Sequence, residues 1–335
     1  MKNYYPDYLT EFQCLKGDCP DSCCQLWEIE VDPETEKRYR TVPGELGKRL
    51  NQVLRKTEDG AVLTLEKGRC PMWREDGLCR IQAELGHDAL CSVCRTYPRF
   101  TQDYGRFREL GLELSCPAAA ERILSGSYAM VEETTDEQPE SAWDDGTLTL
   151  LLNSREKVLS LLKDDTLSVS RILAAMLFYA CAVQEGLYGE NVPDIDPESA
   201  WENGKKFAQP GTMGEVAGFF RELEILTPDW EKRLAQVGEP RLNDRFRPLI
   251  EYFVRRYWLR AVEDLDILCR VKFILVSCLL IGALGGDLTK TAGLYSKEIE
   301  SDPENMEAIF DACYDRRELT DGKLLYFLIN AEKNP

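Results

Sequence analysis

The sequence predicts an α+β protein, in which a small cysteine-rich metal-binding α+β module is followed by a mostly α-helical domain. Nine of the thirteen cysteines fall between Cys14 and Cys116, which marks the module. Beyond residue 147, apolar residues recur at the spacing of amphipathic helices. We therefore divide the chain into a cysteine-rich domain at 1–125, an acidic connector at 126–146 and a helical domain at 147–335.

Two short helices are expected early in the module. Asp32 is a capping carboxylate, and Pro33 follows it in the first turn, where proline is well tolerated. Residues 43–56 carry leucines at helical spacing, which predicts the second helix. Residues 61–65 are a run of β-prone residues and predict a strand that leads toward the next cysteine.

The remaining cysteines of the module are expected at turns and strand ends. A turn at 76–77 places Cys70 and Cys79 on the two sides of a chain reversal, so that their sulfurs can converge. Strands at 99–102 and 106–114 predict a hairpin that ends beside Cys116. Metal ligands in this module would therefore come from loops and strand ends.

The second domain is expected to be helical, with a looser segment in the middle. Asp302 before Pro303 is another helix start. The longest apolar stretch, residues 273–284, is shorter than a bilayer span, and we expect it to be a buried helix. Helical spacing continues through residues 147–162, 170–184, 247–285, 302–314 and 322–331. The four single cysteines of this domain are expected to be small buried hydrophobes: Cys181, Cys269, Cys278 and Cys313.

Charge and the start of the sequence limit the classes of protein. A formal net charge of -18 disfavours nucleic acid and favours cationic partners such as lysine-rich segments, or simply solubility. Residues 1–12 lack the apolar core of a signal peptide, so we expect a cytoplasmic protein that does not insert into a membrane. Thiols stay reduced in that compartment, and the odd number of cysteines also argues against complete pairing. A metal site becomes the leading interpretation.

The choice of metal depends on the donors. The chain has one histidine, His87, which we expect to be a loop residue, so the site would be held by thiolates alone. This favours an iron-sulfur cluster over zinc, and either of these over thiols without a metal. Cys23 and Cys24 are neighbours, and in extended backbone their side chains point to opposite sides, so that two centres are conceivable. Cys91 and Cys94 form a C-x-x-C pair that can bind one metal from a single turn.

Other catalytic patterns are missing from the sequence. The C-x-x-x-C-x-x-C arrangement of radical S-adenosylmethionine enzymes fails because Leu26 stands in the third place after Cys19 and Cys23. There is no phosphate-binding loop, and the glycines at 282–286 follow a helical pattern and not a strand. His87 is a weak partner for a catalytic thiol. Catalytic residues and cofactor-binding residues stay unassigned.

A series of short motifs carries a resemblance to a known family. They are Phe12-Gln13-Cys14, Cys19, Cys23-Cys24, Trp27, Cys70-Pro71, Leu78-Cys79-Arg80, Gly86, Cys94-Arg95-Thr96-Tyr97-Pro98-Arg99 and Leu114-Ser115-Cys116-Pro117. In these motifs the first 125 residues resemble the flagellin lysine-N-methylases. The pieces from Cys19 to Cys24 and from Cys94 to Pro98 also resemble the CxxxCC group of zinc- or iron-chelating proteins.

The resemblance implies an activity and a set of ligands. It implies methyl transfer from S-adenosylmethionine to lysine side chains of flagellin, in a protein that carries a [4Fe-4S] cluster, whose role can be catalytic or structural. The alternative is a non-enzymatic zinc- or iron-binding protein of the CxxxCC type. The family pattern does not require cysteine at position 91, which favours Cys94 over Cys91. The implied ligands are Cys14, Cys19, Cys23, Cys24, Cys70, Cys79, Cys94 and Cys116.

Three residues beside the ligand positions are candidates for a pocket. Trp27, Tyr97 and Arg99 can line a site for an adenine or a carboxylate. For Trp27 and Tyr97 we expect packing around the metal instead.

Overall fold

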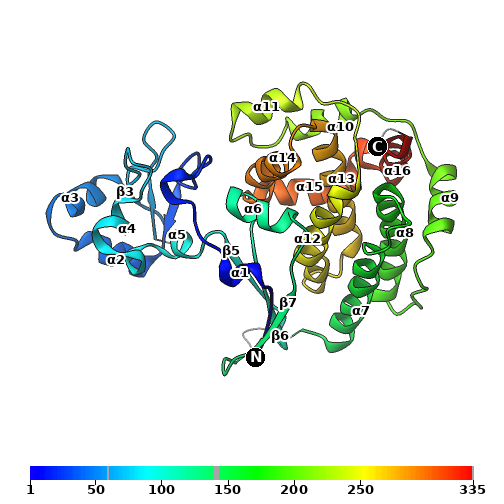
Figure 1. Cartoon of the computed structure of the whole chain (residues 1–335), viewed down its shortest axis with the longest axis horizontal. Helices are drawn as coiled ribbons and strands as arrows, with labels where there is room; N and C mark the ends of the chain where they lie inside the picture. Colours follow the sequence, from blue (N-terminus) through cyan, green and yellow to red (C-terminus); the bar gives the residue numbers. More distant parts are fainter. Residues whose placement is uncertain (59, 139–142, 334–335) are drawn as a thin grey trace.

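The computed structural model describes residues 1–58, 60–138 and 143–333 and shows a small N-terminal module beside a larger helical body (Figure 1). The strands of the module form an antiparallel sheet in the order β2-β4-β3. Its elements are β2 (Ile29–Val31), α2 (Pro33–Arg40), α3 (Gly44–Val53), β3 (Leu54–Lys56), β4 (Ala61–Leu63), α4 (Arg80–Leu85) and α5 (Ser92–Thr96).

The early elements of the module form for the reasons that the sequence indicates. Helix α2 begins at Pro33 because the Asp32 carboxylate accepts a hydrogen bond from the Thr35 N–H at 2.9 Å. Helix α3 buries Leu46 and Leu50 against the sheet side of the module core. The strand expected at 61–65 is confirmed as β4.

A second sheet connects the module to the helical body. Its order is β5-β6-β1-β7, formed by β5 (Arg99–Asp103), β6 (Phe107–Leu112), β1 (Lys2–Pro6) and β7 (Met130–Thr134). The hairpin of β5 and β6 confirms the prediction, and it turns at Gly105, where φ is 73°. Strand β1 runs parallel to β6 and antiparallel to β7.

Strand β7 lies within the connector expected at 126–146. The connector was expected to be an exposed acidic link, but its segment Met130–Thr134 pairs along its length with β1. This pairing satisfies backbone N–H and C=O groups of the segment. From the acidic sequence alone, these groups were expected to be exposed to solvent. Residues 139–142 of this stretch, and residues 334–335 of the helical domain, lie outside the described residues.

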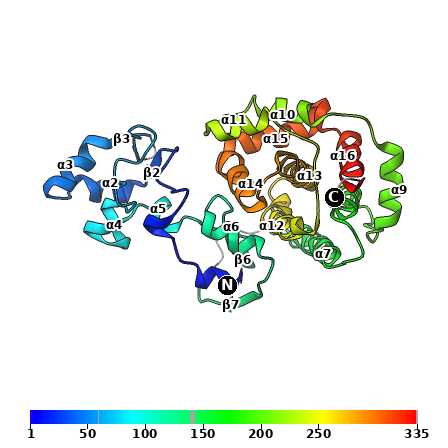
Figure 2. The same cartoon turned by 45° about the horizontal axis from the view of Figure 1, so that its top comes forward.

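The helical body surrounds one central helix. Figure 2 shows α13 in the middle of the body, and its contacts include α8, α12, α14, α15 and α16. Besides the short helix α1 (Tyr8–Glu11), the body contains α6 (Pro117–Leu124), α7 (Asp145–Leu161), α8 (Val169–Leu187), α9 (Pro197–Phe207), α10 (Met213–Phe220), α11 (Pro228–Leu234), α12 (Arg247–Tyr257), α13 (Ile267–Leu284), α14 (Leu288–Tyr295), α15 (Pro303–Asp315) and α16 (Asp321–Lys333).

Helix α13 confirms the buried helix expected at 273–284. Among the described residues it is the one helix long and apolar enough to cross a membrane, but 89% of it is buried inside the molecule. The helical pattern at 247–285 is nevertheless interrupted. Helix α12 ends at Tyr257, and Leu265 adopts a φ of 61° before Asp266 caps α13 by accepting from the Cys269 N–H at 3.0 Å. This left-handed residue separates the two helices.

The hydrophobic cores divide the chain differently from the boundary expected at residue 125. The core of the module is built from residues between Ile29 and Cys94. Leu9, Tyr104 and Leu114 belong instead to the core of the helical body. The first strand and the 99–112 hairpin are therefore parts of the body. Two segments of the chain connect the module to the body.

Candidate metal centre

All thirteen cysteines of the described chain are unpaired, and the nine N-terminal ones fall into two groups. Five thiols pack in or against the core of the module, and we call them the buried thiol group: Cys24, Cys70, Cys79, Cys91 and Cys94. The other four lie near one another, since charge on Cys14 and Cys116 acts on Cys23 and charge on Cys19 and Cys14 acts on Cys116, and we call them the junction thiol group: Cys14, Cys19, Cys23 and Cys116.

Backbone pairing brings the buried thiol group together. The Cys70 N–H donates to the Cys24 carbonyl at 2.9 Å, and Trp73 pairs with Cys79 across the turn that the sequence predicts. Burial raises the pKa of Cys70 to about 12, and charge on Cys24, Cys79 and Cys91 adds to the rise. Thiols from three separate stretches of chain therefore meet in one apolar core.

The C-x-x-C pair lies on one turn of helix. Cys91 is the residue that precedes α5, and Cys94 lies in its first turn. The hydrogen bond with Cys94 lowers the pKa of the Cys91 thiol to about 7, and the same bond raises the pKa of Cys94. Cys91 is only 1% exposed. The structure thus places Cys91 beside Cys94, whereas the family pattern does not require a cysteine at position 91.

The junction thiol group spans the gap between module and body. Cys116 precedes α6 and packs in the core of the body. Cys14 is exposed, and its sulfur accepts from the Lys16 N–H at 3.3 Å. Residues 17–21 contact both the module and the body. Gly17 lies against the turn at Asp76 of the module, and Asp21 forms an ion pair with Lys297 of the body.

Cys23 and Cys24 do not take the extended conformation that the sequence suggests. They lie in a turn, and their side chains hydrogen-bond to each other. This bond lowers the pKa of Cys24 to about 7, while the pKa of Cys23 is raised by the bond, by burial and by charge on Cys14 and Cys116. The expectation of opposite directions is wrong because a turn, unlike a strand, allows neighbouring side chains to meet. The pair instead connects the two groups.

The donor chemistry suits a thiolate-bound metal, whereas the side-chain positions do not yet form a coordination sphere. Among the described residues, no three cysteine, histidine, aspartate or glutamate side chains are arranged so that they could hold a metal ion. Soft thiolates in this number select zinc or iron-sulfur clusters. His87 is exposed beside Asp88 and belongs to neither group, but it begins a short 3-10 helix, His87–Ala89, and does not lie in the expected loop.

Aromatic residues pack at the junction. The Trp27 and Tyr97 rings lie 6.4 Å apart, and the Tyr97 hydroxyl is 3.1 Å from the Ser115 Oγ. The buried ammonium of Lys297 lies 5.1 Å from the Trp27 ring. Arg99 stacks on Phe12 at 5.1 Å. Trp27 and Tyr97 thus pack near each other, and their packing around a metal stays a prediction. Lys297 was missed because nothing in the local sequence marks it.

A network of buried charges lies in the body close to Cys116. Arg256 Nη2 is 3.3 Å from Glu113 Oε1, and Arg256 Nε is 3.5 Å from Glu300 Oε1. Glu300 also accepts from the hydroxyls of Tyr257 at 2.6 Å and Tyr252 at 3.1 Å. Burial raises the pKa of Glu113, although Arg256 opposes the rise. This network brings carboxylates from two distant parts of the sequence near the junction.

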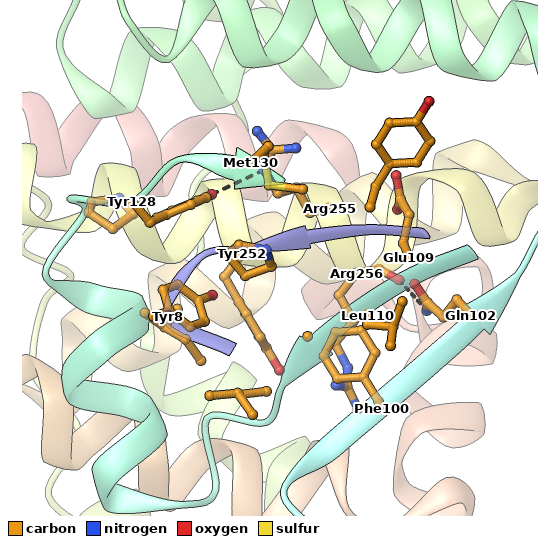
Figure 3. Close-up of a pocket in the computed structure, with 16 residues that line it drawn as sticks. Tyr8, Phe100, Gln102, Glu109, Leu110, Tyr128, Met130, Tyr252, Arg255 and Arg256 are labelled. Atoms are coloured by element: carbon orange, nitrogen blue, oxygen red, sulfur yellow. Dashed lines mark hydrogen bonds between the residues drawn. The ribbon is translucent and has the colours of Figure 1, made fainter. Parts of the chain in front are cut away.

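A small apolar cavity lies between the second sheet and α12. Figure 3 shows Tyr8, Phe100 and Tyr252 around it. The guanidinium carbon of Arg256 lies 4.2 Å from the centre of the Phe100 ring. Its volume of about 40 Å³ admits a few waters or a small group. A ligand of the size of S-adenosylmethionine needs several hundred Å³, roughly 300 or more. A larger, open hollow of about 580 Å³ lies at the end of α13, beside Glu239 and Arg241.

These features define a class: a thiol-rich α+β module joined to a helical body through a mixed sheet. The chain is 27% identical over 253 residues to the lysine-N-methylase of Salmonella typhimurium, which covers 73% of this chain and 61% of that protein. The lysine-N-methylase of Salmonella choleraesuis gives the same figures, 27% over 253 residues. The flagellar biosynthetic protein FliU of Salmonella muenchen is 34% identical over 132 residues, covering 37% of this chain and 78% of that protein.

The chain therefore belongs to the family of the lysine-N-methylases and the flagellar protein FliU. It spans about 61% of the length of the lysine-N-methylases it matches. No family model matches the chain, and no solved structure matches it.

Proposed function

We propose that this protein transfers a methyl group from S-adenosylmethionine to the side-chain amine of lysines on flagellin, with a [4Fe-4S] cluster held by its N-terminal thiolates. The observation that carries the proposal is the match over 253 residues to proteins named lysine-N-methylase. The flagellar name of the FliU relative supports flagellin as the protein substrate.

The chemistry requires a lysine that arrives as a cation and reacts as a neutral amine. A net charge of -18 attracts lysine-rich segments over a distance. The amine must then lose a proton and stand in line with the sulfonium methyl group. Glu113 suits the role of proton acceptor, because its burial raises its pKa while its side chain keeps 25% of its exposure. Its place three residues before Cys116 puts it at the junction.

The donors of the cluster are drawn from the eight expected ligands, because a [4Fe-4S] cluster takes four thiolates. When bound, a cluster supplies iron that can chelate the amino and carboxylate groups of a cofactor, and it also holds the module together. The unpaired state of all described cysteines supports a reducing compartment, and we place the protein in the cytoplasm.

Methyl transfer can be measured directly. Anaerobically purified protein is incubated with flagellin and S-adenosylmethionine labelled in its methyl group, and flagellin peptides are analysed by mass spectrometry. We expect labelled methyl groups on lysine side chains, and none on flagellin whose lysines have been acetylated. The Glu113→Gln variant is expected to lower the rate by roughly 100-fold, the scale of a lost general base.

The Cys181→Ser variant is the matched control, since this thiol lies on α8, outside both thiol groups. Its rate should equal that of the wild type. Metal-loaded protein that neither binds S-adenosylmethionine in calorimetry nor labels flagellin would contradict the proposal and leave a metal-binding protein of the CxxxCC type.

A further inference from the structure

Lys297 is a buried lysine of the body whose ammonium group contacts the N-terminal part of the chain. Its side chain is only 2% exposed, and its Nζ forms an ion pair with Asp21. The same ammonium lies 5.1 Å from the centre of the Trp27 ring. Asp21 and Trp27 thus surround a primary ammonium that comes from a distant part of the sequence, and we call these two residues the cation pocket.

The chemistry of the cation pocket is that of lysine recognition. The face of an indole ring attracts a cation, and a carboxylate accepts charge-assisted hydrogen bonds from an ammonium. Trp27 packs against the core of the module, which fixes its ring. The Asp21 side chain is 44% exposed, so that solvent reaches its carboxylate. The pocket is therefore accessible to a cation from outside, although Lys297 itself is buried.

Lys297 is anchored firmly on its own side. It lies in the π-helix Ser296–Glu300, where the Ser301 N–H donates to the first carbonyl of the turn at 3.0 Å. The next residue, Glu298, accepts from the Leu226 N–H at 2.8 Å. Such π-helical turns are rare and frequently occur at functional sites. Lys297 reaches the cation pocket by its side chain alone, while its backbone stays part of the body.

The contact can be released without disrupting either core. The module and the body have separate hydrophobic cores. Among the described residues, no helix or strand of the module packs extensively against a helix of the body. An ion pair with a half-exposed partner is weak, because solvent screens it. A second cation that offers the same contacts can therefore replace Lys297.

The position of the cation pocket suits the proposed reaction. The Tyr97 ring lies 6.4 Å from the Trp27 ring, and its hydroxyl is 3.1 Å from the Ser115 Oγ. Ser115 follows Glu113, the proposed proton acceptor, by two residues. The cation pocket and this carboxylate therefore lie at the same junction.

We propose that Asp21 and Trp27 bind the substrate lysine, and that Lys297 occupies their pocket as an internal substitute when no substrate is bound. The ligand is a primary ammonium on an unbranched alkyl chain, as in a lysine side chain of flagellin. Its binding displaces the Lys297 ammonium and changes no covalent bond. This inference rests on the proposed function, because it names the place where the lysine substrate is held.

Lysine labelling of the wild type tests the displacement without S-adenosylmethionine. The full chain is treated briefly with acetic anhydride, alone and with saturating flagellin, and mass spectrometry measures the acetylation of each lysine. We expect Lys297 to be protected in the free protein. With flagellin its labelling should be at least about ten-fold faster, because a minor open state of at most about 10% becomes dominant. Flagellin acetylated beforehand should leave Lys297 protected.

The Lys297→Met variant tests the competition. Methionine has a similar length but no charge, so the substrate no longer competes with an internal cation. We expect the KM for flagellin to fall roughly ten-fold with little change in kcat. Lys297→Arg keeps a cation and should keep the KM of the wild type, whereas Asp21→Asn should raise the KM. Circular dichroism verifies that each variant is folded.

Two results would overturn the proposal. One is a Lys297 that stays protected while flagellin is methylated. The other is a folded Lys297→Met variant with a lower kcat and an unchanged or higher KM, which would mean that the contact only holds module and body together. Either result leaves the proposed activity standing. A wild type that methylates no flagellin contradicts the proposed function instead.

Discussion

Glu300 is the carboxylate at the centre of the Arg256 network, and its side chain is only 2% exposed. It accepts from two tyrosine hydroxyls and faces the buried guanidinium. Glu300→Ala leaves Arg256 with Glu113 alone, and we expect it to lower the free energy of unfolding by about 3 kcal/mol. Urea denaturation followed by tryptophan fluorescence measures this loss.

Glu300→Gln is the control for that prediction. The amide oxygen still accepts from the tyrosine hydroxyls, so the loss should be clearly smaller. Equal losses for the two variants would mean that the charge matters and the hydrogen bonds do not. No loss for the alanine variant would contradict the network as described.

Glu298 gives a pH-dependent prediction. It is fully buried, accepts from the Leu226 N–H at 2.8 Å and has a pKa that burial raises above its ordinary value of 4.5. A raised pKa means that the folded state holds its proton more tightly than the unfolded state. The resulting contribution to stability is present below pH 4.5 and is lost as the pH rises through the folded-state pKa.

Glu298→Gln removes this titration while retaining an acceptor for Leu226. Relative to the wild type, the variant should gain stability as the pH is raised from 4.5 toward neutrality. Urea denaturation of both proteins across that range provides the measurement. A difference that stayed constant with pH would show that Glu298 ionises in the folded state as it does in the unfolded state.

The roles of single residues could be predicted where the residue type itself is chemically unusual. They could not be predicted where the role depends only on contacts made in the folded protein. The N-terminal cysteines could be recognised as a group from their density, and His87 could be expected at the surface. Lys297 and Arg256 could not be found, because they reach the junction through folding of distant helices. The direction of Cys23 and Cys24 was missed because these two residues lie in a turn and not in the extended backbone that was assumed.

The link between α2 and α5 is the interaction between elements that bears most directly on the thiols. Asp32 caps α2 through Thr35 and also accepts from the Ser92 N–H at the start of α5. Asp32→Ala removes both acceptors, and we expect a loss of about 1–2 kcal/mol in the free energy of unfolding of the module. Thermal unfolding of the metal-loaded chain measures it.

Glu34→Ala is the matched change in the same first turn, since Glu34 is exposed and makes no hydrogen bond to α5 among the described residues. It should cost a few tenths of a kcal/mol, about 0.3, through the helix dipole. Equal effects of the two substitutions would contradict the capping role of Asp32.

Elements with strong local signals were the predictable ones. The starts of α2 and α15, each an aspartate before a proline, are confirmed. The division between α12 and α13 was not foreseen, because Leu265 adopts a left-handed conformation that its sequence does not favour. Strands β1 and β7 were missed because each is defined by pairing with a distant strand and not by its own pattern.

The whole molecule is an assembly of two cores that meet at the junction thiol group. The α+β class and the order of cysteine-rich module and helical body were predictable from composition and periodicity. The true extent of the module was not, because residues 1–12 and the hairpin after residue 98 join the body by long-range strand pairing. This arrangement puts Cys116 and Glu113 on the body, whereas Cys24, Cys70, Cys79, Cys91 and Cys94 pack in or against the core of the module.

Metal binding by the N-terminal thiols underlies the proposed function, and the metal content of the protein tests it most directly. The full chain is purified without oxygen, and its iron, sulfide and zinc are quantified together with its visible spectrum. We predict a brown protein that contains iron and sulfide. A colourless preparation that is folded by circular dichroism and contains none of these elements would contradict the account.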